Sequence, residues 1–162
     1  MDAVSLPVIQ IKHKGYVDLN QFFKSIRGWL NAEHFRQFES KHKFSPSSRE
    51  VEFEANRKIN DYVRYKIKVL IRVWDVKDVE IIKNGKKVAM NDCRVAIDFN
   101  GEVEFDWMKN KKFDDSPISK AIHDFYHRFI VKRTREAEWI GGLDGKLWQF
   151  QRDIKNMLEF EV

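Results

Sequence analysis

The chain has 162 residues, of which 43% are hydrophobic and 34% are charged. This balance is typical of one globular domain and excludes an intrinsically disordered chain. Lysine and arginine number 30 and the acidic residues 25, so the net charge is only +5. Such a charge permits weak attraction to nucleic acid or anionic lipid, but it does not by itself indicate a function.

Cysteine usage and the N-terminus bear on where the protein resides. Cys93 is the only cysteine in the sequence, which excludes a disulfide framework and a zinc knot and favours a reducing compartment. Residues 1–7 lack the basic start and the apolar stretch of a signal peptide, and no run approaches the roughly 20 apolar residues of a membrane span. We therefore expect a cytoplasmic protein without a membrane span.

The first part of the chain predicts a strand, a helix and a second strand. Residues 9–11 alternate between apolar and polar, and Gly15 is expected to end this strand. Asp18 followed by Gln21 has the spacing of a capping box, which predicts the start of a helix. The apolar stripe of that helix is Leu19, Phe22, Phe23, Ile26, Trp29 and Leu30. Residues 34–44 alternate loosely and predict a strand.

The strongest signal is a pair of alternating segments at 50–55 and 63–73. The first carries glutamates on its polar face, and the second carries lysine and arginine. A hairpin around Ile59 in one register pairs opposite charges on the polar face and apolar residues on the other face. That register pairs Glu54 with Arg64, Glu52 with Lys66, Glu50 with Lys68, Phe53 with Tyr65, and Val51 with Ile67.

Two Asn-Gly pairs interrupt the next alternating segments. Asn84 and Gly85 separate two short apolar segments and tolerate the positive φ of a type I′ turn, so they predict a second hairpin. Residues 95–107 alternate on either side of Asn100 and Gly101, which predicts either a third turn or a bulge within one long strand.

The C-terminal part is predicted to be helical. Ser116 is placed to cap a helix whose dense apolar stripe covers residues 118–130. Gly141 and Gly142 are expected to end this helix, and Asp144 is expected to cap a last one.

These elements predict a single α+β domain over residues 1–162. It consists of an antiparallel meander sheet of about six to seven strands, with an N-terminal helix and two C-terminal helices packed on it. Residues 8–112 supply the first strand, the first helix and the sheet, and residues 116–160 supply the C-terminal helices.

This order of elements resembles the helix-grip superfold of START-like and polyketide-cyclase-like proteins. The resemblance implies a curved sheet that wraps the long C-terminal helix and holds a small apolar ligand between the two. The residues that would line this space are Tyr65, Ile67, Val69, Ile97, Phe99, Ile122, Phe125, Tyr126 and Phe129. The same residues make a closed core equally well.

Few residues indicate catalysis. His123 and His127 have the i, i+4 spacing of the zinc-protease motif, and they favour either a metal-dependent hydrolase or two histidines beside an apolar stripe. Asp124 stands where that motif has its catalytic Glu, and a third ligand is not obvious. Cys93 lies in an apolar alternation, where a thiol is usually inert. We nominate no catalytic residue and expect no cofactor, and whether the chain is an enzyme stays open.

Basic side chains form three clusters in the sequence. They are Lys83, Lys86 and Lys87 at a hairpin tip, Lys109, Lys111 and Lys112 in a loop, and Arg128, Lys132 and Arg135 along one helix. Together they favour RNA or another nucleic acid as an alternative partner, although a solvated basic surface explains them too.

Leu70 and Trp74 interrupt the polar face of the strand at 63–73. They share that face with lysine and arginine, so either another element covers them or they mark a contact patch. The first hypothesis is therefore a non-enzymatic binding domain for a small apolar ligand or for a protein partner at this patch. The oligomeric state is not indicated.

Overall fold

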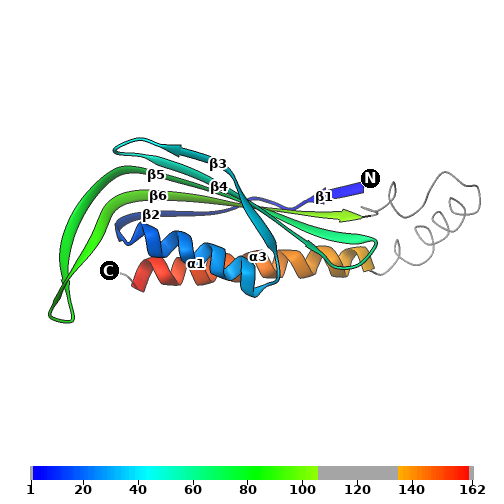
Figure 1. The fold of residues 1–162 in the computed structure, drawn as a ribbon. Coiled ribbons are helices and arrows are strands. Elements are labelled where there is room, and N and C mark those ends of the chain that lie inside the picture. The colour runs from blue at the N-terminus through cyan, green and yellow to red at the C-terminus, as the bar shows by residue number, and fades with distance from the viewer. Residues whose placement is uncertain (1, 106–134, 161–162) are drawn as a thin grey trace, which may run out of the picture.

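The computed structural model describes residues 2–105 and 135–160 (Figure 1). In these ranges the chain forms six strands, β1 (Asp2–Ser5), β2 (Ile9–Val17), β3 (Arg36–Phe44), β4 (Arg49–Lys58), β5 (Val63–Lys83) and β6 (Lys86–Phe105). The two described helices are α1 (Leu19–Ala32) and α3 (Arg135–Phe160). The α+β class and the antiparallel sheet are confirmed, and these ranges hold one N-terminal and one C-terminal helix. The predicted helix with its apolar stripe over 118–130 lies outside the described residues.

β6 organises the sheet. β1 and β2 pair with successive parts of β6 on one side, and β5, β4 and β3 follow in that order on the other side. The sheet curves around α1 and α3, which lie on its concave side (Figure 1). Residues 79–90 of β5 and β6 continue past the sheet as a two-stranded arm, and Figure 1 shows it bending past the N-terminal end of α1 and the C-terminal end of α3.

The hairpin of β4 and β5 forms, but in a different register from the one predicted. Glu54 pairs with Lys68, four residues beyond the predicted Arg64, and Phe53 pairs with Val69. A slip by an even number of residues keeps every side chain on its face, so alternation alone does not distinguish the two registers. The observed register extends the ladder to Lys58, whereas the predicted one leaves the end of β4 unpaired.

A tight turn sets this register. The backbone N–H of Ile59 donates to the carbonyl of Val63 at 2.9 Å. The side-chain oxygen of Asn60 accepts from the backbone N–H groups of Tyr62 at 2.8 Å and Val63 at 2.7 Å. The chain therefore reverses between Ile59 and Val63, because an asparagine side chain completes the turn's hydrogen bonds.

The two Asn-Gly pairs have different outcomes. Asn84 and Gly85, with φ values of 53° and 77°, form the predicted hairpin turn at the tip of the arm. Of the two alternatives predicted at Asn100 and Gly101, the turn is wrong and the single long strand is confirmed, because β6 runs through both residues and Gly101 pairs with Ile67 without a bulge there. A Cβ at Gly101 would lie only 2.4 Å from Cδ1 of Leu147, so this glycine lets α3 approach the sheet.

Two predicted ends of elements are also wrong. Gly15 has a φ of 146° but stays paired with Cys93, so β2 continues to Val17. Gly141 and Gly142 lie inside α3, as does Asp144, which therefore caps nothing. A glycine in a helix costs about 1 kcal/mol relative to alanine, and the burial of apolar side chains that follow it in α3 offsets that cost.

Both helices bury an apolar stripe against the sheet. The oxygen of Asp18 accepts from the backbone N–H of Gln21 at 3.2 Å, so the predicted N-cap of α1 is confirmed. Trp29 of α1 stacks on Phe150 of α3 with ring centroids 3.9 Å apart, and its indole N–H donates to Asp153 at 3.2 Å. The core thus includes the sheet, α1 and α3 together.

Candidate docking surface on the outer face of the sheet

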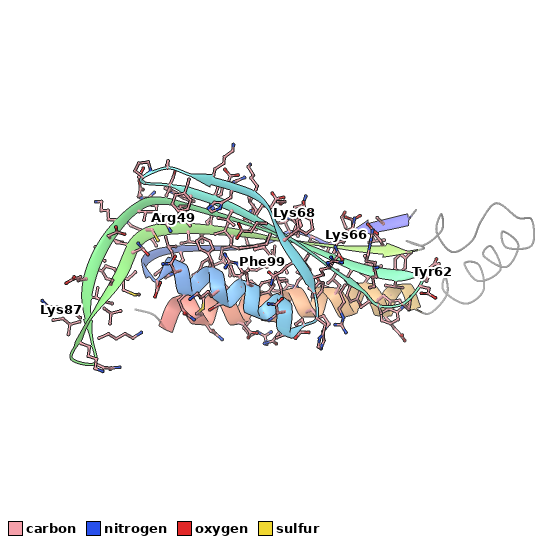
Figure 2. All side chains as sticks on the ribbon, in the orientation of Figure 1. Arg49, Tyr62, Lys66, Lys68, Lys87 and Phe99 are labelled. Carbon is pink, nitrogen blue, oxygen red and sulfur yellow. The ribbon has the colours of Figure 1, made fainter. Side chains whose placement is uncertain are left out.

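The two faces of the sheet differ in what covers them. Every second residue of β5 from Tyr65 to Val73 is buried on the side of the helices. The residues between them point to the other side, which neither helix of the described ranges covers (Figure 1). We call this side the outer face. On β5 it carries Arg64, Lys66, Lys68, Leu70, Arg72 and Trp74, and Figure 2 shows Lys66 and Lys68 on it.

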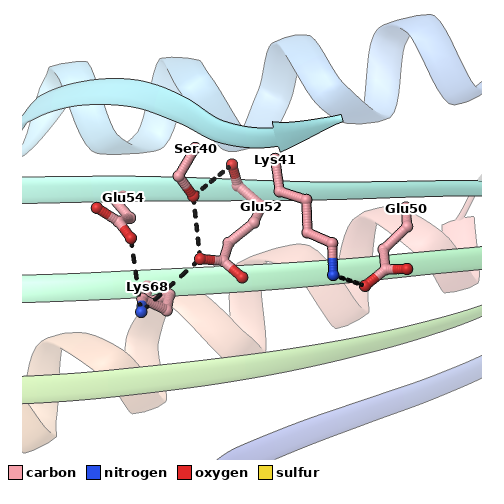
Figure 3. A network of polar contacts seen from close by, with 6 residues as sticks. All are labelled: Ser40, Lys41, Glu50, Glu52, Glu54 and Lys68. Atoms are coloured by element: carbon pink, nitrogen blue, oxygen red, sulfur yellow. Dashed lines mark hydrogen bonds and ion pairs between the residues drawn. The ribbon is translucent and has the colours of Figure 1, made fainter. Parts of the chain in front are cut away.

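A network of charged side chains crosses part of the outer face (Figure 3). Its members are Ser40, Lys41, Glu50, Glu52, Glu54 and Lys68. Lys41 donates to Glu50 at 2.8 Å, and this hydrogen bond lowers the pKa of Glu50 below its ordinary value. Lys68 lies 3.5 Å from Glu54 and 3.7 Å from Glu52. These glutamates therefore serve as partners for lysines, as expected of cross-strand pairs.

Glu104 lies at the other end of this face and is only 4% exposed. It accepts a hydrogen bond from Nε of Arg64 at 2.9 Å and forms an ion pair with Lys66. Arg64 and Lys66 are themselves partly exposed. A buried carboxylate thus fixes two cationic side chains at the edge of the outer face.

A trough of about 590 Å³ lies beside these residues. Its lining is mostly polar and includes Arg64, Lys66, Lys68, Asn100 and Glu102, with Phe38 of β3 at one side. Phe38 is exposed. The chemistry of this lining suits polar and charged groups of a partner better than it suits a small apolar molecule.

The structure brings Leu70 and Trp74 to the outer face, as the alternation predicts. Leu70 is half-buried between Glu52 of β4 and Asp98 of β6. Trp74 is 37% exposed and lies opposite Arg94 of β6. This exposure leaves part of its indole accessible. Whether these two residues form a contact patch stays a prediction.

Trp74 borders a hollow that sequence reasoning missed. The hollow has a volume of about 320 Å³ and is lined by Lys12, His13, Lys14, Trp74, Arg94 and Val95. These residues come from β2, β5 and β6, which are far apart in the sequence, so the strand register assembles the hollow. The alternation of β2 places Lys12 and Lys14 on one face, but it does not reveal which residues lie next to them.

The residues predicted to hold an apolar ligand lie partly in the described chain. Tyr65, Ile67, Val69, Ile97 and Phe99 are buried on the inner face, and burial raises the pKa of Tyr65. The phenol of Tyr65 donates to the carbonyl of Trp139 at 2.8 Å, and Phe99 meets Phe150 edge-on with centroids 5.0 Å apart. The helix members of this set, Ile122, Phe125, Tyr126 and Phe129, lie outside the described residues.

Most of the other predicted site residues also lie outside the described ranges. These are His123 and His127, the loop cluster Lys109, Lys111 and Lys112, and Arg128 and Lys132. Arg135 begins α3, but its side chain is not described. Lys83, Lys86 and Lys87 do lie at the tip of the arm, well beyond Trp74 along β5. Of the three predicted basic clusters, the structure therefore describes only this one in full.

Metal and thiol chemistry have little support in the described chain. Residues 2–105 and 135–160 hold no group of three metal-ligating side chains. Cys93 is buried, and burial raises the pKa of its thiol to about 11. At neutral pH it stays protonated, which makes it a poor nucleophile. Of the two helices described, neither combines the length and the apolar character needed to cross a membrane.

No protein-family model, no curated protein and no solved structure matches this chain. The geometry of the outer face is therefore the basis on which its function is inferred.

Proposed function

We propose that this chain is a non-enzymatic binding domain that docks a partner on the outer face of its sheet, around Leu70 and Trp74. The observation that supports this best is the exposed indole of Trp74 on a sheet face that neither described helix covers. Tryptophan has a large contact area and few rotatable bonds, and it is enriched among residues that dominate binding energy.

The polar surroundings favour a macromolecular partner. The trough beside β5 is lined by charged and amide side chains, and the hollow at Trp74 is lined by three cations. Both features are open and shallow relative to the buried sites that hold small apolar molecules. A partner with many polar groups satisfies such a surface better than a lipid-like molecule does.

The apolar-ligand hypothesis has less support. Leu143, Leu147 and Phe150 of α3 are fully buried against the inner face, where such a ligand would have to lie. The close approach of Leu147 to Gly101 leaves no room for a methyl group at that position. Inner-face packing of this kind is typical of a closed core.

Site-specific photo-crosslinking in cells tests the docking surface while the partner is still unidentified. A photoreactive benzoylphenylalanine is placed at Arg72, which is exposed between Leu70 and Trp74. The matched control carries it at Asn156, which is exposed on α3 on the opposite side of the sheet. We expect a discrete adduct from the Arg72 position and none from the Asn156 position.

A second substitution connects the adduct to the proposed surface. Trp74→Ala introduced beside the photoreactive residue at position 72 should abolish the adduct, whereas Trp148→Ala should not. Trp148 is a suitable control because it is a half-exposed tryptophan on α3. The proposal would be contradicted if adducts form equally at positions 72 and 156, or if the adduct at position 72 still forms in Trp74→Ala.

A further inference from the structure

Trp74 lies in a row of three residues that crosses three strands. Trp74 of β5 pairs with Arg94 of β6, and Arg94 pairs with Lys14 of β2. Neighbouring strands lie about 4.8 Å apart, so the indole, the guanidinium and the ammonium start from backbone positions spanning about 10 Å. The row therefore places an aromatic ring beside two cations on one open face.

The adjacent row extends the cationic character. In this second row, Arg72 of β5 pairs with Ala96 of β6, and Ala96 pairs with Lys12 of β2. The row lies two residues away from the first on each strand. The small side chain of Ala96 leaves the centre of this row low, while Lys12 and Arg72 on either side of it are exposed. On its other side Arg72 pairs with Glu50 of β4, which also binds Lys41. The cations thus follow the direction of β2 next to Trp74, as a track for a chain of negative charges would require.

Acidic groups near this track offset its positive charge only in part. The hollow at Trp74 has no acidic side chain in its lining. Asp75 lies 3.6 Å from Arg94, but the two side chains are 67% and 50% exposed, and such exposed pairs contribute little to stability. A neighbouring hollow is lined by Asp75 and Asp92 together with Lys14, Lys77 and Arg94, so two carboxylates stand beside three cations there. Arg94 meets Asp75 only as an exposed pair, which a competing anion can replace.

A flat ring next to a track of cations matches single-stranded nucleic acid. Bases stack on exposed aromatic side chains regardless of sequence, and lysine and arginine contact the phosphates that connect them. A duplex does not fit as well, because its bases are already stacked on each other and cannot reach an indole on a sheet surface.

We propose that the outer face binds single-stranded nucleic acid, with one base stacked on Trp74 and phosphates contacting Lys12, Lys14 and Arg94. This inference rests on the proposed docking surface and names its partner.

Fluorescence anisotropy of labelled 15-nucleotide polyuridine and oligo(dT), titrated with the full chain, tests this inference. Three phosphate contacts on a single strand give a salt slope of about −2, so affinity should fall about 20-fold between 50 and 200 mM salt. Loss of one stacked base in Trp74→Ala should weaken binding by about 5- to 150-fold, and Trp74→Phe should retain part of it. Lys14→Glu should weaken binding and flatten the salt slope.

Matched controls separate a local effect from a general loss of charge or fold. Trp148→Ala and Arg152→Glu change exposed residues of α3 and should leave oligonucleotide binding unchanged. Lys14 lies on an edge strand with its side chain exposed, so Lys14→Glu tests the inference even if Trp74→Ala fails to fold.

Three results would overturn the inference. The first is an absence of oligonucleotide binding at 50 mM salt. The second is binding that persists in Trp74→Ala and Lys14→Glu but is lost when Lys83, Lys86 and Lys87 are changed together. The third is binding only to phosphatidylserine vesicles. If the adduct from position 72 resists nuclease and yields to protease, the docking surface stands and only the nucleic-acid partner is wrong.

Discussion

Replacement of Glu104 by glutamine is expected to destabilise the fold measurably while changing almost no volume. Glu104 is 4% exposed and holds both Arg64 and Lys66. The substitution removes the negative charge and leaves two cations beside a neutral amide. Complete loss of one partner from a buried ion pair costs about 3–5 kcal/mol.

Partial rehydration of the cations lowers this cost. The side chain of Arg64 is 23% exposed and that of Lys66 is 42% exposed, so both can recover some contact with water. Glutamine also keeps an oxygen that can accept from Arg64. We therefore expect Glu104→Gln to lower the free energy of unfolding by about 2 kcal/mol, between the values for an exposed and a buried pair.

Urea unfolding followed by circular dichroism measures this change. With a slope of about 2 kcal/mol/M, the midpoint should move down by about 1 M at an unchanged slope. The control is Glu102→Gln, two residues away on the same face and half-exposed, which should change stability by less than about 0.5 kcal/mol. The difference should persist in 0.5 M salt, because salt screens buried pairs weakly. Equal effects of the two substitutions would refute the reasoning.

Three further substitutions probe the packing, the turn and the buried thiol. Gly101→Ala places a Cβ 2.4 Å from Leu147 and should lower the free energy of unfolding by about 1–3 kcal/mol. Leu147→Ala in the same chain should recover part of that loss. An unchanged thermal midpoint in Gly101→Ala would contradict the close packing. Asn60→Ala removes the acceptor of two backbone N–H groups and should cost about 1 kcal/mol by urea unfolding, whereas Asn60→Asp should cost less. Burial raises the pKa of Cys93 from 9.0 to about 11, so its contribution to stability is complete below pH 9 and is lost as the pH rises toward 11. Unfolding of wild type and Cys93→Ala at pH 8 and pH 10.5 should reveal this, with a steeper loss in wild type; parallel losses would contradict it.

Period-two alternation and turn residues predicted much of the sheet. They gave the strands β4, β5 and β6, the N-cap at Asp18 and the turn at Asn84, because each of these depends on neighbours in the sequence. The register of β4 and β5 was wrong by four residues, since both registers keep the same faces. The observed register still pairs Glu54 with Lys68 and Glu50 with Arg72, but it places Glu52 opposite Leu70. The choice between them depends on the side chain of Asn60 in the turn, a detail that alternation does not report.

Predictions that read a glycine as a turn or as the end of a helix were wrong where a tertiary contact requires the glycine. Gly141 and Gly142 predicted the end of a helix, yet α3 continues through them. An ideal Cβ at Gly142 would lie 3.0 Å from the phenol oxygen of Tyr65, so this glycine lets the helix backbone approach the sheet. Gly101 has the same role within β6. In each case the missing side chain allows the helix and the sheet to approach each other closely, and the glycine forms no local turn. The sequence alone does not indicate which residues make this contact.

The candidate site was only half predictable for the same reason. Leu70 and Trp74 stood out because they break the polar alternation of one strand, which is a local signal. Lys14 and Arg94 did not, because only the pairing of β2, β5 and β6 brings them beside Trp74. A slip of β5 against β6 by four residues would keep every face intact and would still separate Trp74 from Arg94. Hence alternation predicts the face on which each residue lies. Only the register determines which residues of neighbouring strands lie side by side, and the proposed binding depends on that arrangement.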